Sequence, residues 1–179
     1  EQQLANAVLM IRPARFESNP MTAASNRFQN RTGASGDELQ SVAAAEFEGI
    51  RRALEDAGVR VIQVDDTPEP HTPDSIFPNN WVSFHADGTV VLYPMEAPNR
   101  RSERRQDIID AMDAEYGFHI NRIVDLTGHE ADDSFLEGTG SLVLDRLHRT
   151  AYAARSARTH PSALAEFGRL AGYRVVVFD

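Results

Sequence analysis

The chain has 179 residues, of which 41% are apolar, so it is long enough to bury a core, and we expect one globular domain or most of one. Its formal net charge of -9 opposes binding to nucleic-acid phosphates and anionic lipid surfaces. No apolar run approaches the length of a membrane span, and the first residues lack a secretion-signal pattern, so we expect a cytoplasmic protein without membrane partners. The sequence holds no cysteine, which excludes disulfides and thiolate metal sites within it.

The first predicted strand, VLMIRP, is followed by a long connection from Ala14 to Asp37. Asn, Ser, Thr and Gly are common in this connection. At this length it favours a functional loop or lid, with a plain linker as the alternative.

Apolar residues at helical spacing predict three amphipathic helices, each of which ends at a glycine. The helices contain residues 43–57, 108–116 and 164–171, and the glycines are Gly58, Gly117 and Gly172. A β-branched or aromatic run that closes on an aspartate follows each glycine. These runs are VRVIQVD, FHINRIVD and YRVVVFD, ending at Asp65, Asp125 and Asp179. The repeated order predicts three supersecondary modules.

Two hairpins are expected between the modules. The first joins NNWVSF to TVVLYP around residues 85–88, where Asp-Gly favours a tight turn, and the second joins GSLVLD to RTAYAA around residues 146–148. Each later module is therefore predicted to run strand, strand, helix, strand.

Two segments concentrate residues that could carry chemistry. Asn79 and Asn80 begin a predicted strand, although amides are poor strand formers, so the alternatives are a functional role or a turn held by Asx hydrogen bonds after Pro78. Glu137 begins another strand pair between small residues that let a ligand approach the backbone. An edge-strand glutamate facing water is the competing interpretation.

Four arginines open the second predicted helix. A solvated face paired with Glu103 and Asp107 is the preferred interpretation of Arg104 and Arg105. For Arg100 or Arg101 two interpretations stay open: the same solvated face, or a guanidinium that binds a substrate carboxylate with two hydrogen bonds.

The segment GHEADDSFLEG supplies His129, three acids and Glu137, but its spacing matches no metal motif. We interpret it as a solvated acidic loop and expect neither a metal nor a cofactor. The remaining histidines, placed in turns, before a helix or, for His119, in a strand, are expected to be structural or exposed.

The segments VLMIRP with TAASNRFQ, DSIFPNNWVSFHADGTVVLYPMEAPNRRSERR, and FLEGTGSLVLDR with AYAARSART resemble the amidinotransferase and arginine deiminase-related superfamily of guanidine-modifying enzymes. The resemblance is nearest to the citrulline-utilisation hydrolases and runs over nearly the whole chain. It implies an α/β fold, the pentein-type α/β propeller of five ββαβ modules. Three of them would be present here, over residues 8–65, 75–126 and 135–179 of a single domain, 1–179.

The resemblance also implies roles for particular residues. In the superfamily a cysteine attacks the central carbon of a guanidinium or ureido group, and a histidine acts as general acid and base. Glu137 matches the glutamate of the EGxG motif and would hold the reacting group near the propeller axis, with Phe77 packing on its plane. Asp74 would bind the amino-acid end of the substrate, and Arg100 or Arg101 its carboxylate.

Asn80 matches a position that is usually aspartate in arginine-specific members. An amide can accept from a ureido NH2 and donate to its oxygen without adding charge, which favours citrulline over arginine.

The superfamily's histidine and cysteine would both lie beyond Asp179, so the chain is expected to be part of a longer polypeptide, inactive alone and partnered by further C-terminal modules or another chain. The alternatives are a non-catalytic propeller scaffold that binds a protein and a metal-binding protein using the cluster from His129 to Glu137.

Overall fold

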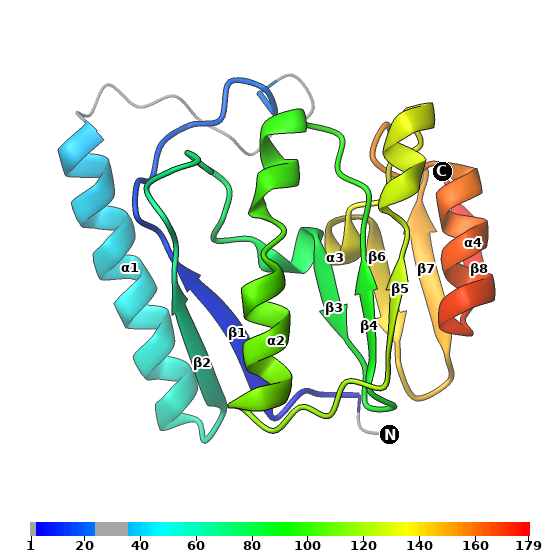
Figure 1. Cartoon of the computed structure of the whole chain (residues 1–179), viewed down its shortest axis with the longest axis horizontal. Helices are drawn as coiled ribbons and strands as arrows, with labels where there is room; N and C mark the ends of the chain where they lie inside the picture. The colour runs from blue at the N-terminus through cyan, green and yellow to red at the C-terminus, as the bar shows by residue number, and fades with distance from the viewer. Residues whose placement is uncertain (1–2, 24–35) are drawn as a thin grey trace. The chain divides into compact units, whose positions relative to one another are not determined.

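The structure is a computed structural model that describes residues 3–23 and 36–179. It is an α/β protein of alternating strands and helices (Figure 1). The chain divides into two compact units, Ala5–Pro78 and Asn79–Asp179, the latter together with Gln3 and Leu4. Each unit is described by itself. The α/β class predicted from the sequence is confirmed, and the assembly of modules into a propeller stays a prediction.

The unit Ala5–Pro78 is built on two parallel strands, β1 (Ala7–Arg12) and β2 (Arg60–Asp65), paired along their whole length. Parallel strands need a crossover, and helix α1 (Gly36–Asp56) supplies it. Phe47 of α1 and the strand residues Ile11 and Ile62 are all buried. Residues 24–35 of the expected loop or lid between Ala14 and Asp37 lie outside the described residues.

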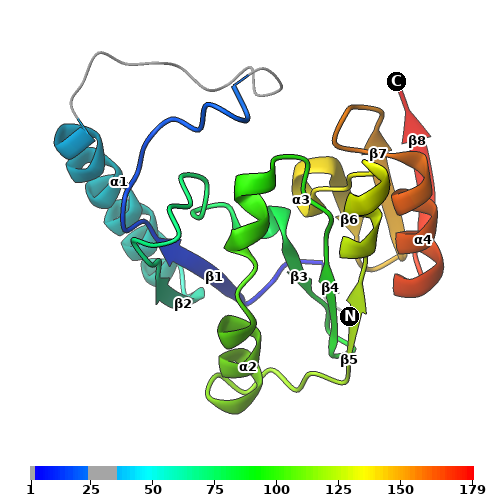
Figure 2. The same ribbon diagram turned by 45° about the horizontal axis from the view of Figure 1, so that its top comes forward.

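The unit from Asn79 onward contains two copies of one arrangement. In the first copy β3 (Val82–Phe84) pairs antiparallel with β4 (Thr89–Leu92), and β4 pairs parallel with β5 (Arg122–Asp125) after helix α2 (Gln106–Ala114). In the second, β6 (Leu142–Asp145), β7 (Thr150–Ala154) and β8 (Arg174–Phe178) repeat this pairing around helix α4 (Pro161–Ala171). Figure 2 shows α4 lying along β8. The predicted order strand, strand, helix, strand is therefore observed twice.

The three glycines after the long helices have positive φ angles of 78°, 77° and 72° at Gly58, Gly117 and Gly172. An L-residue rarely adopts this left-handed conformation, so glycine ends each helix at the predicted position.

One apolar core then joins both copies of the repeat. Its members, all buried, are Val91, Tyr93, Val124, Leu126, Leu136, Leu142, Leu144, Ala151, Ala153, Ala163, Leu164, Phe167, Ala171 and Tyr173.

Short helical turns occupy the connections between the strands and carry most of the polar residues of interest. They are η1 (Pro78–Asn80), η2 (Pro98–Glu103), η3 (Thr127–Asp132) and α3 (Gly138–Ser141). The sequence-based placement of Asn79, Asn80 and Glu137 at strand starts was wrong, because η1 and α3 precede β3 and β6. Arg100 and Arg101 lie in η2, so they precede α2 instead of opening it.

The predicted strand FHINRIVD was too long. Only Arg122–Asp125 is a strand, so His119 does not lie in one. The backbone N–H of Phe118 donates to Met112 of α2, and that of Ile120 to the Asp113 carboxylate, which removes these donors from any ladder. Within the described residues, no helix is both long and apolar enough to cross a bilayer.

Candidate active site

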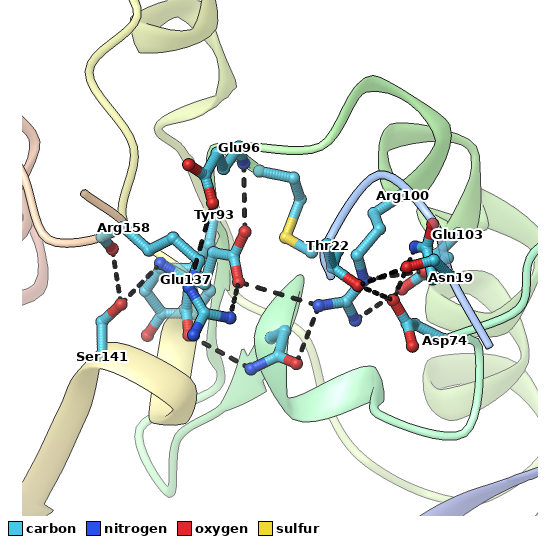
Figure 3. Close-up of polar contacts among 12 residues, drawn as sticks. Asn19, Thr22, Asp74, Tyr93, Glu96, Arg100, Glu103, Glu137, Ser141 and Arg158 are labelled. Carbon is cyan, nitrogen blue, oxygen red and sulfur yellow. Dashed lines mark hydrogen bonds and ion pairs between the residues drawn. The ribbon is translucent and has the colours of Figure 1, made fainter. Parts of the chain in front are cut away.

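Glu137 has one of the most deeply buried charged side chains of the described structure, with 1% of its surface exposed. One carboxylate oxygen, Oε1, accepts a hydrogen bond of 3.0 Å from the backbone N–H of Glu96. The other, Oε2, accepts one of 3.2 Å from Nη1 of Arg158 (Figure 3). Both oxygens therefore have donors, which is the condition under which a buried carboxylate is tolerated.

The backbone around Glu137 is tied to the loop that carries Arg158. The N–H of Glu137 donates to Oγ of Ser141 at 3.1 Å, and that hydroxyl donates to the carbonyl oxygen of Arg158 at 2.5 Å. An isolated antiparallel bridge also joins Leu136 to Thr159. These contacts fix the loop that presents Arg158 against the carboxylate.

Asn80 lies beside Glu137 and bonds at both ends of its amide. Nδ2 donates to the carbonyl oxygen of Glu137 at 3.4 Å, and Oδ1 accepts from Nη1 of Arg100 at 3.1 Å. Asn79, next to it, donates to Oγ1 of Thr139 at 3.1 Å. Long-range contacts of these two amides, in place of a local Asx turn, therefore hold η1 against α3.

Arg100 is buried, with 3% of its surface exposed, and its guanidinium forms two hydrogen bonds of 2.9 Å with Glu103. Such a parallel pair is the strongest geometry available to arginine and carboxylate. Nη1 of Arg100 also lies 3.7 Å from Oε2 of Glu137. The predicted clamp on a substrate carboxylate by Arg100 or Arg101 stays a prediction, and for Arg100 it would require a side chain already held on three sides.

The other arginines of this region have internal partners. Arg101 donates through Nε to the carbonyl oxygen of Met95 at 3.1 Å, and Arg104 donates to Glu130 at 3.0 Å. Arg105 pairs with Asp107, as predicted. The predicted pairing of Arg104 with Glu103 was wrong, because Glu103 is taken up by Arg100 and the helical turn η3 brings Glu130 to Arg104.

The small residues after Glu137 allow a close approach, and the approaching group is the chain itself. A Cβ at Gly138, whose φ is +41°, would lie 2.2 Å from the carbonyl oxygen of Asn79. A Cβ at Gly140 would lie 2.3 Å from Nδ2 of Asn80. The sequence-based interpretation assigned this space to a ligand, whereas here the glycines let η1 pack onto α3.

Two further predicted site residues, Asp74 and Phe77, belong to the unit Ala5–Pro78. The Asp74 carboxylate accepts from Nδ2 of Asn19 at 2.7 Å and from the Thr22 hydroxyl at 3.5 Å. Phe77 is 46% exposed and lines an apolar cavity of about 220 Å³ with residues of β1 and α1, among them Met10 and Phe47. The structure therefore brings together Asn80, Arg100 and Glu137. Asp74 and Phe77 belong to the other unit, and their roles in substrate binding stay predictions.

The acidic segment before Glu137 forms ion pairs. His129 contacts Glu166, and Glu130 binds Arg104. Among the described residues, no group of three or more His, Cys, Asp or Glu side chains is arranged to hold a metal ion.

His85 is structural. Its ring contacts the hydroxyls of Ser83 at 2.9 Å and Tyr173 at 3.3 Å within the core. Burial, and secondarily the positive charge of Arg146, lowers the pKa of His85 to about 4.

Sequence reasoning missed Arg158 and Glu96. Arg158 lies 21 positions after Glu137 in a connection of ordinary composition, and long-range contacts such as the bridge from Leu136 to Thr159 and the bond from Ser141 bring it close. The Glu96 carboxylate lies 4.0 Å from Nε of Arg158. The signal available in the sequence was the segment ARSART, which was used for the resemblance but not for the site.

A family model described as "N,N dimethylarginine dimethylhydrolase, eukaryotic" matches residues 12–179. No curated protein sequence matches the chain.

Solved structures share the fold. The N-terminal domain of ArgZ, an arginine dihydrolase from the ornithine-ammonia cycle in cyanobacteria, was solved with its substrate bound. It is 20% identical over 96% of this chain and 56% of its own, with a TM-score of 0.68. A dimethylarginine dimethylaminohydrolase from Pseudomonas aeruginosa, complexed with citrulline, is 17% identical over 96% of this chain and 60% of its own, with a TM-score of 0.62.

The chain thus spans somewhat more than half the length of these relatives. The match to the family model covers nearly all of the sequence, and the superfamily resemblance stated from the sequence is confirmed. The chain belongs to the N,N-dimethylarginine dimethylhydrolase family, within the pentein superfamily of guanidino-modifying hydrolases.

Proposed function

We propose that this chain carries the carboxylate half of a hydrolase site that cleaves the C–N bond of a guanidino or ureido compound. Glu137 would hold the nitrogens of the reacting group and stabilise the charge that develops on it. The attacking cysteine and the general acid-base histidine would be contributed by residues outside this sequence, which contains no cysteine. The three repeats would then be modules of a five-module α/β propeller.

The observation that carries the proposal is the environment of the Glu137 carboxylate. It is buried, its oxygens point at N–H donors, and one of those donors is a guanidinium, that of Arg158 at 3.2 Å. A carboxylate that binds a protein guanidinium in this geometry offers the same hydrogen bonds to the planar end of arginine, dimethylarginine or citrulline. The relatives support this class, since one is an arginine dihydrolase and another was solved with citrulline.

Asn80 supports a neutral ureido compound such as citrulline as the preferred substrate. Its amide donates to the Glu137 carbonyl and accepts from Arg100, and a carboxylate at this position could not donate. The amide keeps a second N–H and a second lone pair, so it can still bond to a ureido group without placing another negative charge beside it. An aspartate there would instead favour a cationic guanidinium.

The proposal is tested with the full-length polypeptide that carries this sequence. Citrulline, arginine and N,N-dimethylarginine are supplied separately, and release of ammonia or dimethylamine is followed over time. Replacement of one oxyanion-type contact typically lowers kcat by about 10²–10³-fold, so Glu137→Gln is expected to lose at least a hundredfold. Citrulline is expected to be the best of the three substrates.

Glu115→Gln is the matched control, because Glu115 is exposed and lies outside the site. It should retain wild-type activity, and circular dichroism should show that both variants are folded. If the wild-type enzyme hydrolyses none of the three compounds, the proposed function is wrong. If arginine is hydrolysed much faster than citrulline, only the assignment of a neutral substrate fails.

A further inference from the structure

We infer that Asn19 is a positioning residue, which holds the Asp74 carboxylate in the orientation needed to bind the α-amino group of an amino-acid substrate. This inference rests on the proposed function and deepens it, because it adds a requirement to the substrate: a free α-amino group besides the planar ureido or guanidino end. Asn19 acts through Asp74 and does not touch the substrate itself. Both residues belong to the unit Ala5–Pro78.

The amide of Asn19 can bond to its neighbours in only one orientation. Asn19 is buried, with 1% of its surface exposed. Its Oδ1 accepts from the backbone N–H of Met21 at 3.1 Å, and its Nδ2 donates to Oδ2 of Asp74 at 2.7 Å (Figure 3). Turning the amide over would place an oxygen against a carboxylate oxygen and an NH2 group against an N–H, so both neighbours select the same orientation.

A backbone turn sets the position of this amide. The N–H of Thr22 donates to the carbonyl oxygen of Asn19 at 3.3 Å, and Pro20 suits the second position of such a turn because its φ is already fixed. The Thr22 hydroxyl has one hydrogen, which is shared between that carbonyl oxygen at 3.3 Å and Oδ2 of Asp74 at 3.5 Å. Of the two donors from this turn, Asn19 therefore gives Asp74 the stronger bond.

The main chain around Asp74 is held from the other direction. The next residue, Ser75, donates through Oγ to the Asp66 carboxylate at 2.7 Å. Asp66 directly follows β2, and its N–H donates at 3.0 Å to the carbonyl oxygen of Arg12, the last residue of β1. The sheet thus fixes where the backbone of Asp74 lies, and the orientation of its carboxylate is left for Asn19 to set.

The chemistry of these contacts suits an ammonium group. Asn19 and Thr22 are neutral donors, so their bonds orient the Asp74 carboxylate without cancelling its charge. Asp74 is partly exposed whereas Asn19 is buried, so a ligand can reach the carboxylate but not the amide. An ammonium nitrogen bound there gains a charge-assisted hydrogen bond, which is stronger than a bond between neutral groups and depends more on where the carboxylate points.

The test uses two ligands that differ only in the α-amino group. Citrulline carries this group, and δ-ureidovaleric acid lacks it but has the same chain, carboxylate and ureido end. Their kcat/KM values are measured on the full-length polypeptide and expressed as the ratio of citrulline to its analogue. If arginine is the better substrate, arginine and δ-guanidinovaleric acid give the same comparison.

Asn19→Ala should lower this ratio by about tenfold or more, as expected for loss of a hydrogen bond to a charged group. The loss should appear as a higher KM for citrulline at nearly unchanged kcat, because the amino group is bound equally before and during the reaction. Asn19→Asp keeps the acceptor for the Met21 N–H and replaces the donor by an oxygen, so it retains the turn. It should lower the ratio at least as far as Asn19→Ala.

Two comparisons show whether the effect passes through Asp74. In an Asp74→Asn background, adding Asn19→Ala should change the ratio by less than about twofold, because the interaction that Asn19 supports is already lost. Gln40→Ala is the matched control, since this amide holds the same connection through the Phe16 N–H at 2.6 Å and the Pro13 carbonyl oxygen at 2.9 Å. It should leave the ratio unchanged within about twofold, and circular dichroism should show a folded protein for every variant.

The outcomes separate the inference from the proposed function. If Asn19→Ala and Asn19→Asp lower kcat/KM for both ligands by the same factor, Asn19 only supports the fold, and the inference is overturned while the enzyme activity stands. It is also overturned if Asn19→Ala still lowers the ratio in the Asp74→Asn background, because Asn19 would then contact the ligand itself. If the wild-type protein hydrolyses neither citrulline nor arginine, the proposed function fails and the inference falls with it.

Discussion

Replacement of Gly138 by alanine should be among the most damaging single-methyl changes in this chain. The new Cβ would lie 2.2 Å from the carbonyl oxygen of Asn79, well inside the 3.0 Å that such atoms keep from one another. The obstacle is backbone, so η1 must move away from α3 by roughly the missing ångström. Displacement of this kind costs about 1–3 kcal/mol. The φ of +41° adds about 1 kcal/mol, because an L-residue is strained there.

We therefore expect Gly138→Ala to lower the free energy of unfolding by about 2–4 kcal/mol. Two other glycines provide a graded comparison. At Gly140 the obstructing atom is the side-chain tip Nδ2 of Asn80, which can rotate, so Gly140→Ala should cost about 1 kcal/mol or less while breaking the bond from Asn80 to Glu137. A Cβ at Gly128 meets nothing within 4 Å, so Gly128→Ala should stay within about 0.5 kcal/mol of wild type.

Urea denaturation followed by circular dichroism measures all three differences. The rate of hydrolysis is a second measurement, because Gly140→Ala should impair hydrolysis while stability stays nearly unchanged. The reasoning is refuted if Gly138→Ala is as stable as Gly128→Ala, since the close approach of η1 to α3 would then be absent in solution.

Two further predictions concern residues outside the site. The pKa of His85 is about 4 in the folded protein, against 6.5 when exposed, so the unfolded chain binds the proton more readily and stability is lost as pH falls from about 6.5 toward 4. This loss amounts to about 3 kcal/mol. The urea midpoints at pH 7.5 and 4.5 should therefore differ less in His85→Gln than in wild type. An equal difference in the two proteins would contradict the assignment. Glu130→Ala should lower the free energy of unfolding by about 2 kcal/mol at pH 7.5, because it removes the partner of Arg104 and leaves the Met95 N–H without its acceptor. A loss below about 0.5 kcal/mol would show that the pair of Arg104 and Glu130 is solvated.

The repeated secondary structure could be predicted because each of its signals is local. Helical spacing of apolar residues, a glycine with positive φ and a β-branched run are all written in consecutive residues, and α1, α2 and α4 end where Gly58, Gly117 and Gly172 indicated. The Asp-Gly turn before β4 is equally local, since Gly88 has a φ of 77°. These local patterns are sufficient to predict the order strand, strand, helix, strand.

The errors lie where long-range contacts decide the backbone. Residues 118–121 have strand-like composition, but Phe118 and Ile120 donate their N–H groups to α2, and Asn121 donates its own to Gly88. Glu137 and Asn80 precede β6 and β3 by helical turns because Gly138 and Asn79 pack against each other, a contact between residues 59 positions apart. Nothing local distinguishes Arg158, which meets Glu137, from Arg155, which meets Asp179.

The buried charges themselves argue for function over stability. Taking Glu137, Arg100 and Glu103 out of water costs several kcal/mol per ion before pairing, and a packed apolar cluster would fill the same space at lower cost. The ion pairs offset this cost only because each carboxylate oxygen of Glu137 and Glu103 has a donor. These donors stay in place because Asn80, Glu103 and Ser141 hold the turns η1, η2 and α3. An arrangement that is expensive to build and rigid once built is what a site needs to hold a planar nitrogen group in one orientation.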